Sequence, residues 1–491
     1  MIGDLNSEFA SIELGDARLT KRLSQLADRL LASPQSSIQS ACRSWDETVG
    51  AYRFLGNEEV EPDAILQSHR DALEQRIGAQ EPGESILYIQ DTTELDYTTK
   101  RQMEGTGPLG KAGKNTRQGL FLHSHYVVTE IGLPLGTYGA KLYARDDSKS
   151  KAKPLDPIEG KESVRWLEGY QQACELAAKL RDRELWVIND REGDIYELFA
   201  CREERLQANQ PAAQLLVRAN RDRCLLNEQG QEQAQSLYEK AAQGKVVGTI
   251  AFELQAGPSK RLKGFKQRPP RKTRRVTQEL RVSELRPRPP RRTGQKLPTL
   301  KLWTIQAEEV DPPEGEEPLS WTLISTSPIK DFAQARKLVQ YYTRRWQIEV
   351  FFRILKTGCQ VEELQLKHER SVHNALMLYS LIAWRIHYLV HLGRSCPDLP
   401  CSVLFEVHEW RATLAVARFQ KNKKTKAKNP VSIPQKDEEP SLAEMILILA
   451  KLGGYLARKN DPPPGAQSLW QGMIQAIHYA QAWEAMGHPM D

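Results

Sequence analysis

Between residues 85 and 219 the spacing of the apolar residues changes repeatedly, and this change is the feature that most constrains the fold. Short or alternating apolar runs, typical of β-strands, are separated by segments with helical periodicity. The expected strands are 86–90, 119–129, 133–144, 185–189 and 214–219, and the expected helices are 162–180 and about 194–205. This order predicts an α/β domain in which helices flank a mixed sheet.

The order of three strands, helix, strand, helix and strand is the one expected of an RNase H-like core. A further strand at 320–326 and a long helix from about 331 to 357 close this core. Residues from about 220 to 310 form an insertion. Its alternating segments favour antiparallel strands at 246–255, 274–285 and 299–310. We therefore expect a multidomain α/β protein whose RNase H-like catalytic core carries an inserted β-rich basic subdomain.

A helical domain is expected on each side of the core, because 491 residues are too many for one ordinary hydrophobic core. Residues 15–32 have an amphipathic pattern that Asp16 can cap. The expected domains are 1–75 (helical, DNA-binding), 76–395 (catalytic), 396–440 (linker with a basic run) and 441–491 (helical, dimerising).

Positive charge is concentrated in the insertion. Residues 260–296 contain fifteen Lys or Arg and only two acidic residues, whereas the whole chain has a net charge of +6. An Arg-rich block of this kind is typical of a surface that binds phosphates. A solvated loop is the alternative, and the block by itself indicates only a polyanionic partner.

The apolar stretch 375–392 is interrupted by Arg385, His387 and His391, so we expect a buried helix and no membrane partner. The first residues lack the basic and apolar pattern of a secretory signal. Seven cysteines without a CxxC pair indicate reduced thiols. These features predict a cytoplasmic protein, associated with the nucleoid in a bacterium.

The segment 341–358 carries the strongest local pattern. At 100° per residue, five polar side chains fall on one stripe about 80° wide, while most of the remaining circumference is apolar. They are Tyr342, Arg345, Glu349, Arg353 and Lys356. Such a helix must be largely buried, and a buried ladder of ion pairs explains the stripe as well as a catalytic role does.

Two aspartates follow expected strands: Asp91 follows 86–90 and Asp190 follows 185–189. Carboxylates at strand ends face the crevice where α/β proteins bind ligands. Taken singly, each aspartate is more simply a helix cap or a turn residue. Together with Glu349 they supply the oxygen ligands that magnesium requires, so the three are candidate catalytic and metal-binding residues. Two Mg²⁺ ions, which Mn²⁺ can replace, then suit displacement at phosphorus.

Several motifs in the same order carry a family resemblance. The spacing Tyr-x2-Arg-x3-Glu-x6-Lys from Tyr342 to Lys356 resembles the signature of the IS-four family of insertion-sequence transposases. DTT at Asp91, DRE-x-DI from Asp190 and RRW-x-IE ending at Glu349 resemble the catalytic motifs of that family. LGDARLTKRL and GAYRFLGN near the start and LGGYLARK near the end extend the resemblance over nearly the whole chain.

The resemblance implies cut-and-paste transposition through a DNA hairpin, in which Trp321 accepts a flipped base. It implies that residues 1–75 bind double-stranded DNA at the transposon ends. The C-terminal helices then form a homodimer in the synaptic complex, and the 3′ ends join target DNA. For Trp321, an ordinary place in a strand core is the alternative. The expected DNA-binding residues are Tyr342, Arg345, Lys356, Arg353, Trp321, Arg218, Arg271, Arg274 and Arg275.

Two other functions compete with this hypothesis. Another RNase H-like nuclease, such as a resolvase, shares the carboxylates but has no use for the flanking domains or for Trp321. A non-catalytic repressor derived from a transposase binds DNA without cutting it. Three clustered carboxylates count against the repressor, because negative charge opposes binding where DNA must lie.

Overall fold

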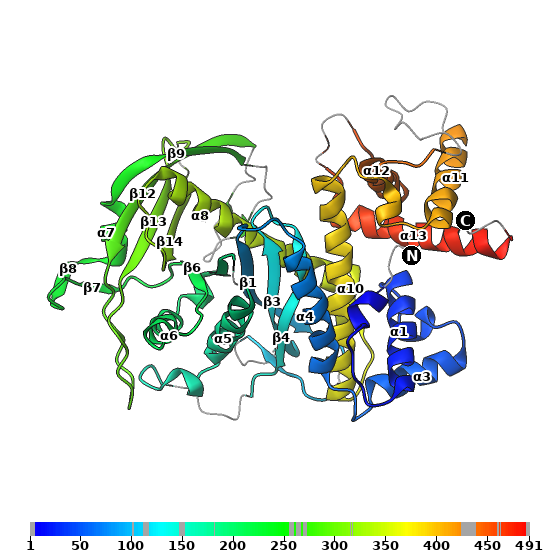
Figure 1. Cartoon of the computed structure of the whole chain (residues 1–491), viewed down its shortest axis with the longest axis horizontal. Coiled ribbons are helices and arrows are strands. Elements are labelled where there is room, and N and C mark those ends of the chain that lie inside the picture. Colours follow the sequence, from blue (N-terminus) through cyan, green and yellow to red (C-terminus); the bar gives the residue numbers. More distant parts are fainter. Residues whose placement is uncertain are drawn as a thin grey trace. The chain divides into compact units, whose positions relative to one another are not determined.

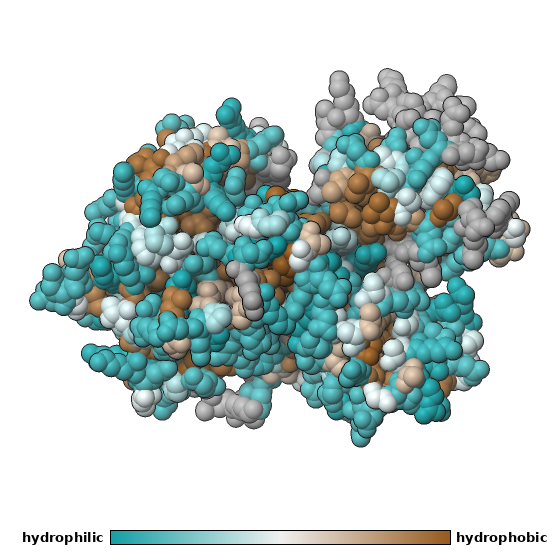
Figure 2. All heavy atoms as spheres, viewed as in Figure 1, coloured by the Kyte–Doolittle hydropathy of each residue, from teal (hydrophilic) through white to brown (hydrophobic). Residues whose placement is uncertain are grey.

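The computed structural model describes residues 5–487, with side chains omitted at 260–261, 267–268, 395 and 421–423. The gaps within this range are 101–102, 111–116, 147–152, 181, 255–259, 262–266, 269–272, 315, 317, 424–437, 459–460 and 462. The chain divides into two compact units, drawn in Figure 1. Unit 1 comprises Met1–Glu81, Thr92–Ser150 and Trp346–Asp491, and unit 2 comprises Pro82–Asp91 and Lys151–Arg345. On the face in Figure 2, hydrophilic residues cover most of the described surface of both units.

Unit 1 is mainly helical. Its helices are η1 (Asn6–Phe9), α1 (Ala17–Ala32), α2 (Ile38–Ala41), α3 (Trp45–Leu55), α4 (Pro62–Gly78), α9 (Trp346–Arg353), the π-helix η4 (Ile354–Gly358), η5 (Val361–Glu363), α10 (Glu369–Ser395), η6 (Cys401–Val403), α11 (Val407–Lys423), α12 (Leu442–Leu452) and α13 (Ala466–Ala485). Its strands are β2 (Gly107–Leu109), β3 (Arg117–Thr129) and β4 (Pro134–Tyr143), together with the second part of β1 (Ile86–Asp96).

Unit 2 contains the first part of β1 and most of the other strands. They are β5 (Leu185–Asn189), β6 (Gln214–Arg218), β7 (Cys224–Leu226), β8 (Glu232–Ser236), β9 (Lys245–Leu254), β10 (Lys260–Arg261), β11 (Gln267–Arg268), β12 (Arg274–Leu285), β13 (Leu302–Glu309) and β14 (Ser320–Ser325). Its helices are η2 (Ile158–Gly160), α5 (Val164–Lys179), η3 (Arg191–Gly193), α6 (Tyr196–Gln207), α7 (Leu237–Ala242) and α8 (Phe332–Arg344).

The main sheet has ten strands in the order β2-β3-β1-β5-β6-β14-β13-β12-β9, with β4 paired to β3. β1, β5 and β6 are parallel, whereas β14 is antiparallel to β6. α5 contacts β5, and α8 contacts β6, β9 and β12. The predicted mixed sheet flanked by helices is therefore confirmed, and the order β4-β3-β1-β5-β6 is that of an RNase H-like core.

The strands of the insertion continue the core sheet. β12 pairs in antiparallel fashion with β9 and β13, and β13 pairs with β14, which returns to β6 (Figure 1). The expected antiparallel strands 246–255, 274–285 and 299–310 correspond to β9, β12 and β13. Because every strand in this series has a hydrogen-bonded neighbour, these strands extend the sheet of unit 2 without a break.

A buried ion cluster joins the first residues of unit 1 to its sheet. The Glu8 carboxylate accepts hydrogen bonds from His69 at 2.6 Å and from Arg76 at 2.6 and 3.0 Å. The other ring nitrogen of His69 accepts the Thr137 backbone N–H at 3.0 Å. We call Glu8, His69 and Arg76 the Glu8 cluster. Its bonds fix the neutral tautomer of His69 and hold η1, α4 and β4 together.

α10 is the one described helix that is long and apolar enough to cross a membrane by length and composition alone. However, 78% of its apolar window is buried inside the fold. Its residues pack against α3, α4, β4, α12 and α13. α10 is therefore a core helix of unit 1, as the interrupting charged and polar residues predict.

The C-terminal helices share a core of their own. Residues from the end of α10, from α11, α12 and α13 bury their apolar side chains together, including Trp410, Met445 and Met473. α12 and α13 approach closely at two glycines, because a Cβ at Gly453 or Gly472 would lie 1.8 Å from a backbone oxygen of the other helix. This close approach requires glycine at both positions.

The long helix expected over 331–357 is divided into three parts. α8 ends at Arg344, α9 begins at Trp346, and a π-helix follows from Ile354, where the Cys359 N–H donates to the Ile354 carbonyl at 2.8 Å. A wider turn changes the angle between successive side chains, so the assumed 100° per residue does not hold at Lys356. Trp346 lies on the apolar part of the circumference and is 54% exposed, so the expectation that this helix is largely buried is wrong at this position.

Candidate functional site

Asp91 and Asp190 occupy neighbouring positions on two adjacent parallel strands. β1 pairs with β5 from Ile86 opposite Leu185 to Gln90 opposite Asn189, so Asp91 and Asp190 are the next residues in register. Adjacent strands lie about 4.8 Å apart. The backbone therefore places these two residues at adjacent positions, at the point where β5 ends.

Asp91 lies within its strand, which corrects the expectation that it follows the strand. β1 continues to Asp96, because β3 remains its neighbour after β5 has ended. Just beyond the strand, the Tyr97 N–H donates to the Gln118 carbonyl at 2.8 Å. Continued pairing on one side explains why polar residues stay extended here.

Arg345 forms an ion pair with Asp91. Its guanidinium donates a hydrogen bond of 2.9 Å to the Asp91 carboxylate, and the two side chains are 14% and 16% exposed. Asp190 caps the short helix η3 by accepting the Glu192 N–H at 2.8 Å. Both carboxylates are hydrogen-bonded and remain partly accessible to solvent.

Tyr342 lies among these charged groups. Burial raises the pKa of its hydroxyl, although Arg345 and a hydrogen bond with Arg218 act in the opposite direction, and Asp190 raises the pKa further. The phenol therefore stays protonated at neutral pH and can donate a hydrogen bond. We call Asp91, Asp190, Arg218, Tyr342 and Arg345 the Asp91 cluster, all of which belong to unit 2.

Trp321 stands beside this cluster. Its ring centroid is 6.1 Å from that of Tyr342, and the side chain is partly exposed on β14. It borders a cavity of about 420 Å³ that Phe252 of β9 and Phe332 of α8 also line. The tryptophan therefore presents aromatic surface to a space that a flat ring could enter.

The remaining residues of the predicted stripe belong to unit 1. Glu349 is half-buried on α9, and Arg353 at the end of that helix is exposed. The Lys356 ammonium donates to the Glu94 carbonyl at 2.7 Å and pairs with Glu362 at 3.2 Å. Lys356 is thus held against the end of β1.

The arginines chosen from the basic insertion differ from one another. Arg274 pairs with Glu309 and Glu316, and its hydrogen bond lowers the pKa of Glu309. Arg275, the next residue along β12, is exposed. Arg271 lies outside the described residues. Arg274 therefore stabilises the end of the sheet, while Arg275 presents its charge to solvent.

Three family models match the chain. A transposase DNA-binding model matches residues 4–60, a transposase DDE domain matches 228–385, and a transposase Tn5 dimerisation domain matches 381–483. Together these matched ranges cover most of the chain in the order that the family resemblance predicts. The chain is a Tn5-like DDE transposase.

The matched models establish three properties of the transposase. It binds DNA, it forms dimers, and its DDE domain has metal-dependent nuclease and transposase activity. The match to the DDE domain includes Trp321 and Glu349 but begins after Asp91 and Asp190. The dimerisation model begins within α10, so it includes the shared core of the C-terminal helices.

The donor chemistry of the Asp91 cluster fits a hard cation. Asp91 and Asp190 offer carboxylate oxygens, which magnesium prefers over nitrogen or sulfur ligands. Among the residues that the structure describes, no group of three or more His, Cys, Asp or Glu side chains is arranged around a common metal position. The guanidinium of Arg345 supplies the positive charge beside Asp91.

Sequence reasoning missed the role of Asp194, which organises the loop after β6. This carboxylate is buried, accepts the N–H groups of Asn220 and Arg221 at 2.8 and 3.0 Å, and pairs with Arg223 at 2.7 Å. Its position four residues after Asp190, within the DRE-x-DI motif, is the sequence feature that could have indicated it.

Proposed function

We propose that the transposase cuts DNA strands with Asp91, Asp190 and Glu349 as its metal-binding carboxylates. The observation that carries this proposal is the parallel register of β1 and β5, which makes Asp91 and Asp190 neighbours. Divalent cations held by these oxygens, Mg²⁺ above all, supply charge that stabilises the attacking and leaving oxygens of a displacement at phosphorus. Glu349 completes the proposed set from α9.

Arg345 exchanges partners in this proposal. Beside Asp91 it balances the carboxylate through a bond of 2.9 Å. Planar guanidinium groups also bind phosphate oxygens in a bidentate manner, so Arg345 can turn from Asp91 to a phosphate when cation and DNA bind. The Asp91 carboxylate can then bind the cation, and Arg345 neutralises charge that develops on the phosphate.

Tyr342 and Lys356 hold phosphates in the same proposal. Since burial keeps the Tyr342 phenol protonated, it can donate a hydrogen bond to a phosphate oxygen. Lys356 and the exposed Arg353 add positive charge along the bound strand. Arg218 supports the site by its hydrogen bond with Tyr342.

We also propose that cleavage proceeds through a hairpin. Water attacks the first strand, the freed 3′-hydroxyl attacks the opposite strand, and a second hydrolysis opens the hairpin before the 3′ ends join target DNA. A tight hairpin requires a base to leave the stack, and base stacking on an aromatic side chain contributes roughly 1–3 kcal/mol. The cavity beside Trp321 suits such a base.

The transposon ends, the target DNA and the synaptic dimer are the proposed partners. Residues 1–75 bind the ends, 76–395 catalyse, 396–440 connect, and 441–491 contribute to the dimer. The exposed Arg275 of the insertion, and Arg271 with it, contact the DNA backbone in this scheme. A nucleoid-associated protein of the bacterial cytoplasm has access to both kinds of DNA.

The decisive experiment compares Asp190→Asn with the wild type. Both are incubated with Mg²⁺ and labelled DNA of the flanking genomic region, and nicks and hairpins are mapped on sequencing gels. We expect cleavage to fall at least about 1000-fold, because several kcal/mol of transition-state stabilisation are lost. DNA binding in a gel-shift assay should remain.

Asp182→Asn is the matched control, because Asp182 is exposed and lies just before β5. Unchanged cleavage by Asp190→Asn would remove Asp190 from the chemistry. A wild-type protein that binds these DNA ends and never cleaves them would instead indicate a repressor.

A further inference from the structure

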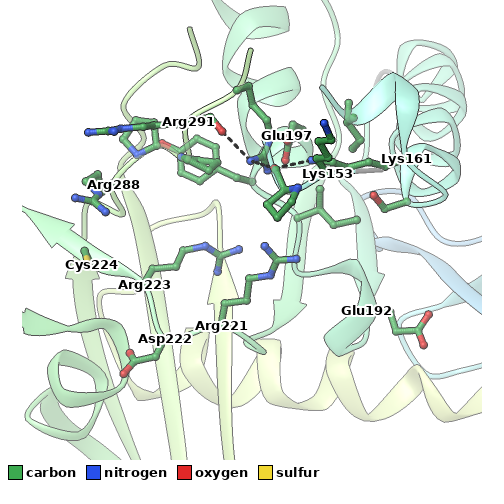
Figure 3. A pocket seen from close by; sticks show the side chains of 18 of the residues that line it. Lys153, Lys161, Glu192, Glu197, Arg221, Asp222, Arg223, Cys224, Arg288 and Arg291 are labelled. Atoms are coloured by element: carbon green, nitrogen blue, oxygen red, sulfur yellow. Dashed lines mark hydrogen bonds and ion pairs between the residues drawn. The ribbon is translucent and has the colours of Figure 1, made fainter. Parts of the chain in front are cut away.

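A second cavity, of about 1120 Å³, lies wholly within unit 2 (Figure 3). Its walls come from four separate parts of the chain: 153–163, 192–197, 221–232 and 288–292. Seven basic but only four acidic side chains line it. The excess of positive charge distinguishes it from an apolar ligand pocket.

Some of the lining cations are neutralised by nearby acids. Arg292 pairs with Glu197 at 2.6 Å, and Arg288 pairs with Glu232. Arg223 pairs with the buried Asp194 at 2.7 Å. These pairs hold the walls in place and engage two of the four acids that line the cavity, Glu197 and Glu232.

Three lining cations remain without such compensation. The side chains of Lys153, Arg221 and Arg291 have no ion pair and no hydrogen bond within the described part of the chain, and all three are exposed. In Figure 3 the guanidinium groups of Arg221 and Arg223 point toward one another. Asp194 already balances Arg223, so Arg221 is the member of this pair whose charge an anion would compensate.

The positive potential acts on Lys161 as well. Its ammonium donates to the Pro154 carbonyl at 3.0 Å. Burial lowers the pKa of Lys161, and the charges of Arg292 and Arg221 lower it further. An anion in the cavity would offset this repulsion.

The turn that carries Asp190 also fixes the backbone position of Arg221. Asp194 accepts the Arg221 backbone N–H at 3.0 Å, so the loop after β6 is fixed to the turn 190–195. Glu192 and Ile195 of this turn line the cavity. The cavity is thus built on the segment that immediately follows a proposed catalytic residue.

We propose that this cavity binds the phosphodiester backbone of a DNA strand, apart from the phosphate that reacts. The inference rests on the proposed function, because it assumes that DNA lies along the turn 190–195. Guanidinium groups match phosphate oxygens in geometry as well as charge. A volume above the usual range for small-molecule pockets, up to about 1000 Å³, favours a segment of polymer.

The test removes two of the uncompensated charges in the full-length protein. Arg221→Ala/Arg291→Ala is compared with Arg221→Lys/Arg291→Lys, which keeps the charge. A fluorescent DNA duplex is titrated at several salt concentrations in Ca²⁺, so that binding is measured without relying on cleavage. Each phosphate contact contributes about 0.9 to the slope of log affinity against log salt, so the slope should fall by about 2 in the alanine variant. The lysine variant should keep most of the slope.

Cys224 provides a local report on the same cavity. It lines the cavity and is the exposed cysteine among the seven, each of which lies in the described part of the chain. Bound DNA should slow its alkylation by a maleimide in the wild type and in the lysine variant. In the alanine variant this protection should be weaker.

The outcomes separate this proposal from the proposed function. If the wild type cleaves DNA but the alanine variant keeps the full salt slope and the protection of Cys224, the cavity does not bind DNA. If inorganic phosphate binds the wild type and not the alanine variant while the salt slope is unchanged, the ligand is free phosphate. If Asp190→Asn still cleaves DNA, only the catalytic assignment of Asp190 is contradicted. The salt dependence of binding tests the cavity independently of that result.

Discussion

The Glu8 cluster and the Asp91 cluster contain similar groups, namely acids, arginines and an aromatic ring, but they differ in accessibility. His69 and Glu8 are 0% and 4% exposed at their side chains, and Arg76 lies over the ring of Trp384 at 4.3 Å. Asp91 and Arg345 are 16% and 14% exposed. In the first cluster the acid and the imidazole are closed to solvent, although Arg76 is 20% exposed, whereas in the second the carboxylate itself is partly accessible and can bind a cation.

This difference follows from the cost of burying charge. A buried ion pair is tolerated only when its hydrogen bonds are satisfied, and the Glu8 carboxylate accepts three of them. The bond between Arg345 and Asp91 can be exchanged at lower cost, because water can reach both groups. We expect changes in the Glu8 cluster to affect stability and changes in the Asp91 cluster to affect activity.

The largest effect is expected for Arg345→Ala. Loss of a cation that stabilises transition-state charge should reduce DNA cleavage about 100- to 1000-fold. The midpoint of urea unfolding should move little, since the pair with Asp91 is accessible to solvent. Nicking of labelled DNA in Mg²⁺ measures the first quantity and tryptophan fluorescence the second. Lys330→Ala, at an exposed position just before α8, is the control.

Glu8→Gln should lower stability and leave cleavage activity unchanged. Removing the charge that faces His69 and Arg76 should lower the free energy of unfolding by about 3 kcal/mol. Cleavage per folded molecule should remain close to that of the wild type, because Glu8 has no part in the proposed chemistry. Urea unfolding monitored by circular dichroism measures the change, with Glu13→Gln as an exposed control. If Glu8→Gln lost cleavage while its unfolding was unchanged, the proposal that the Glu8 cluster serves stability and the Asp91 cluster serves activity would be wrong.

The smallest effect concerns pH. Burial lowers the pKa of His69, so the unfolded chain takes up a proton more readily than the fold does. Stability should therefore decrease as the pH falls below about 6.5, the ordinary value for histidine. The hydrogen bonds of Glu8 outweigh its burial and lower its pKa to about 2, so a second loss should follow below about 4.5.

Unfolding midpoints between pH 8 and 4 test the pH dependence. The decrease near pH 6.5 should be smaller in His69→Gln, which cannot take up a proton there. An equal decrease in this variant would assign the pH dependence to another group.

The sequence alone was sufficient to locate most of the regular elements. Alternating apolar residues predicted β9, β12 and β13 before their pairing was known, and Asp16 caps α1 as expected by accepting the Arg18 N–H. These patterns are local, because the side-chain period of a strand or helix and the chemistry of a cap depend on residues within a few positions. The motifs around Asp91 and Asp190 were readable for the same reason.

What the sequence could not determine depends on partners that are distant along the chain. β1 extends past Asp91 because β3 remains beside it, and Trp346 is exposed although Ile348 and Phe351 of the same helix are buried. The basic cavity of unit 2 assembles residues 153, 221 and 291, whose proximity no local pattern encodes. Periodicity indicates which side of a helix or strand is apolar. Only tertiary packing determines which other parts of the chain each side contacts. For that reason the tertiary structure, and not the sequence, shows which charges are compensated and which remain available to a ligand.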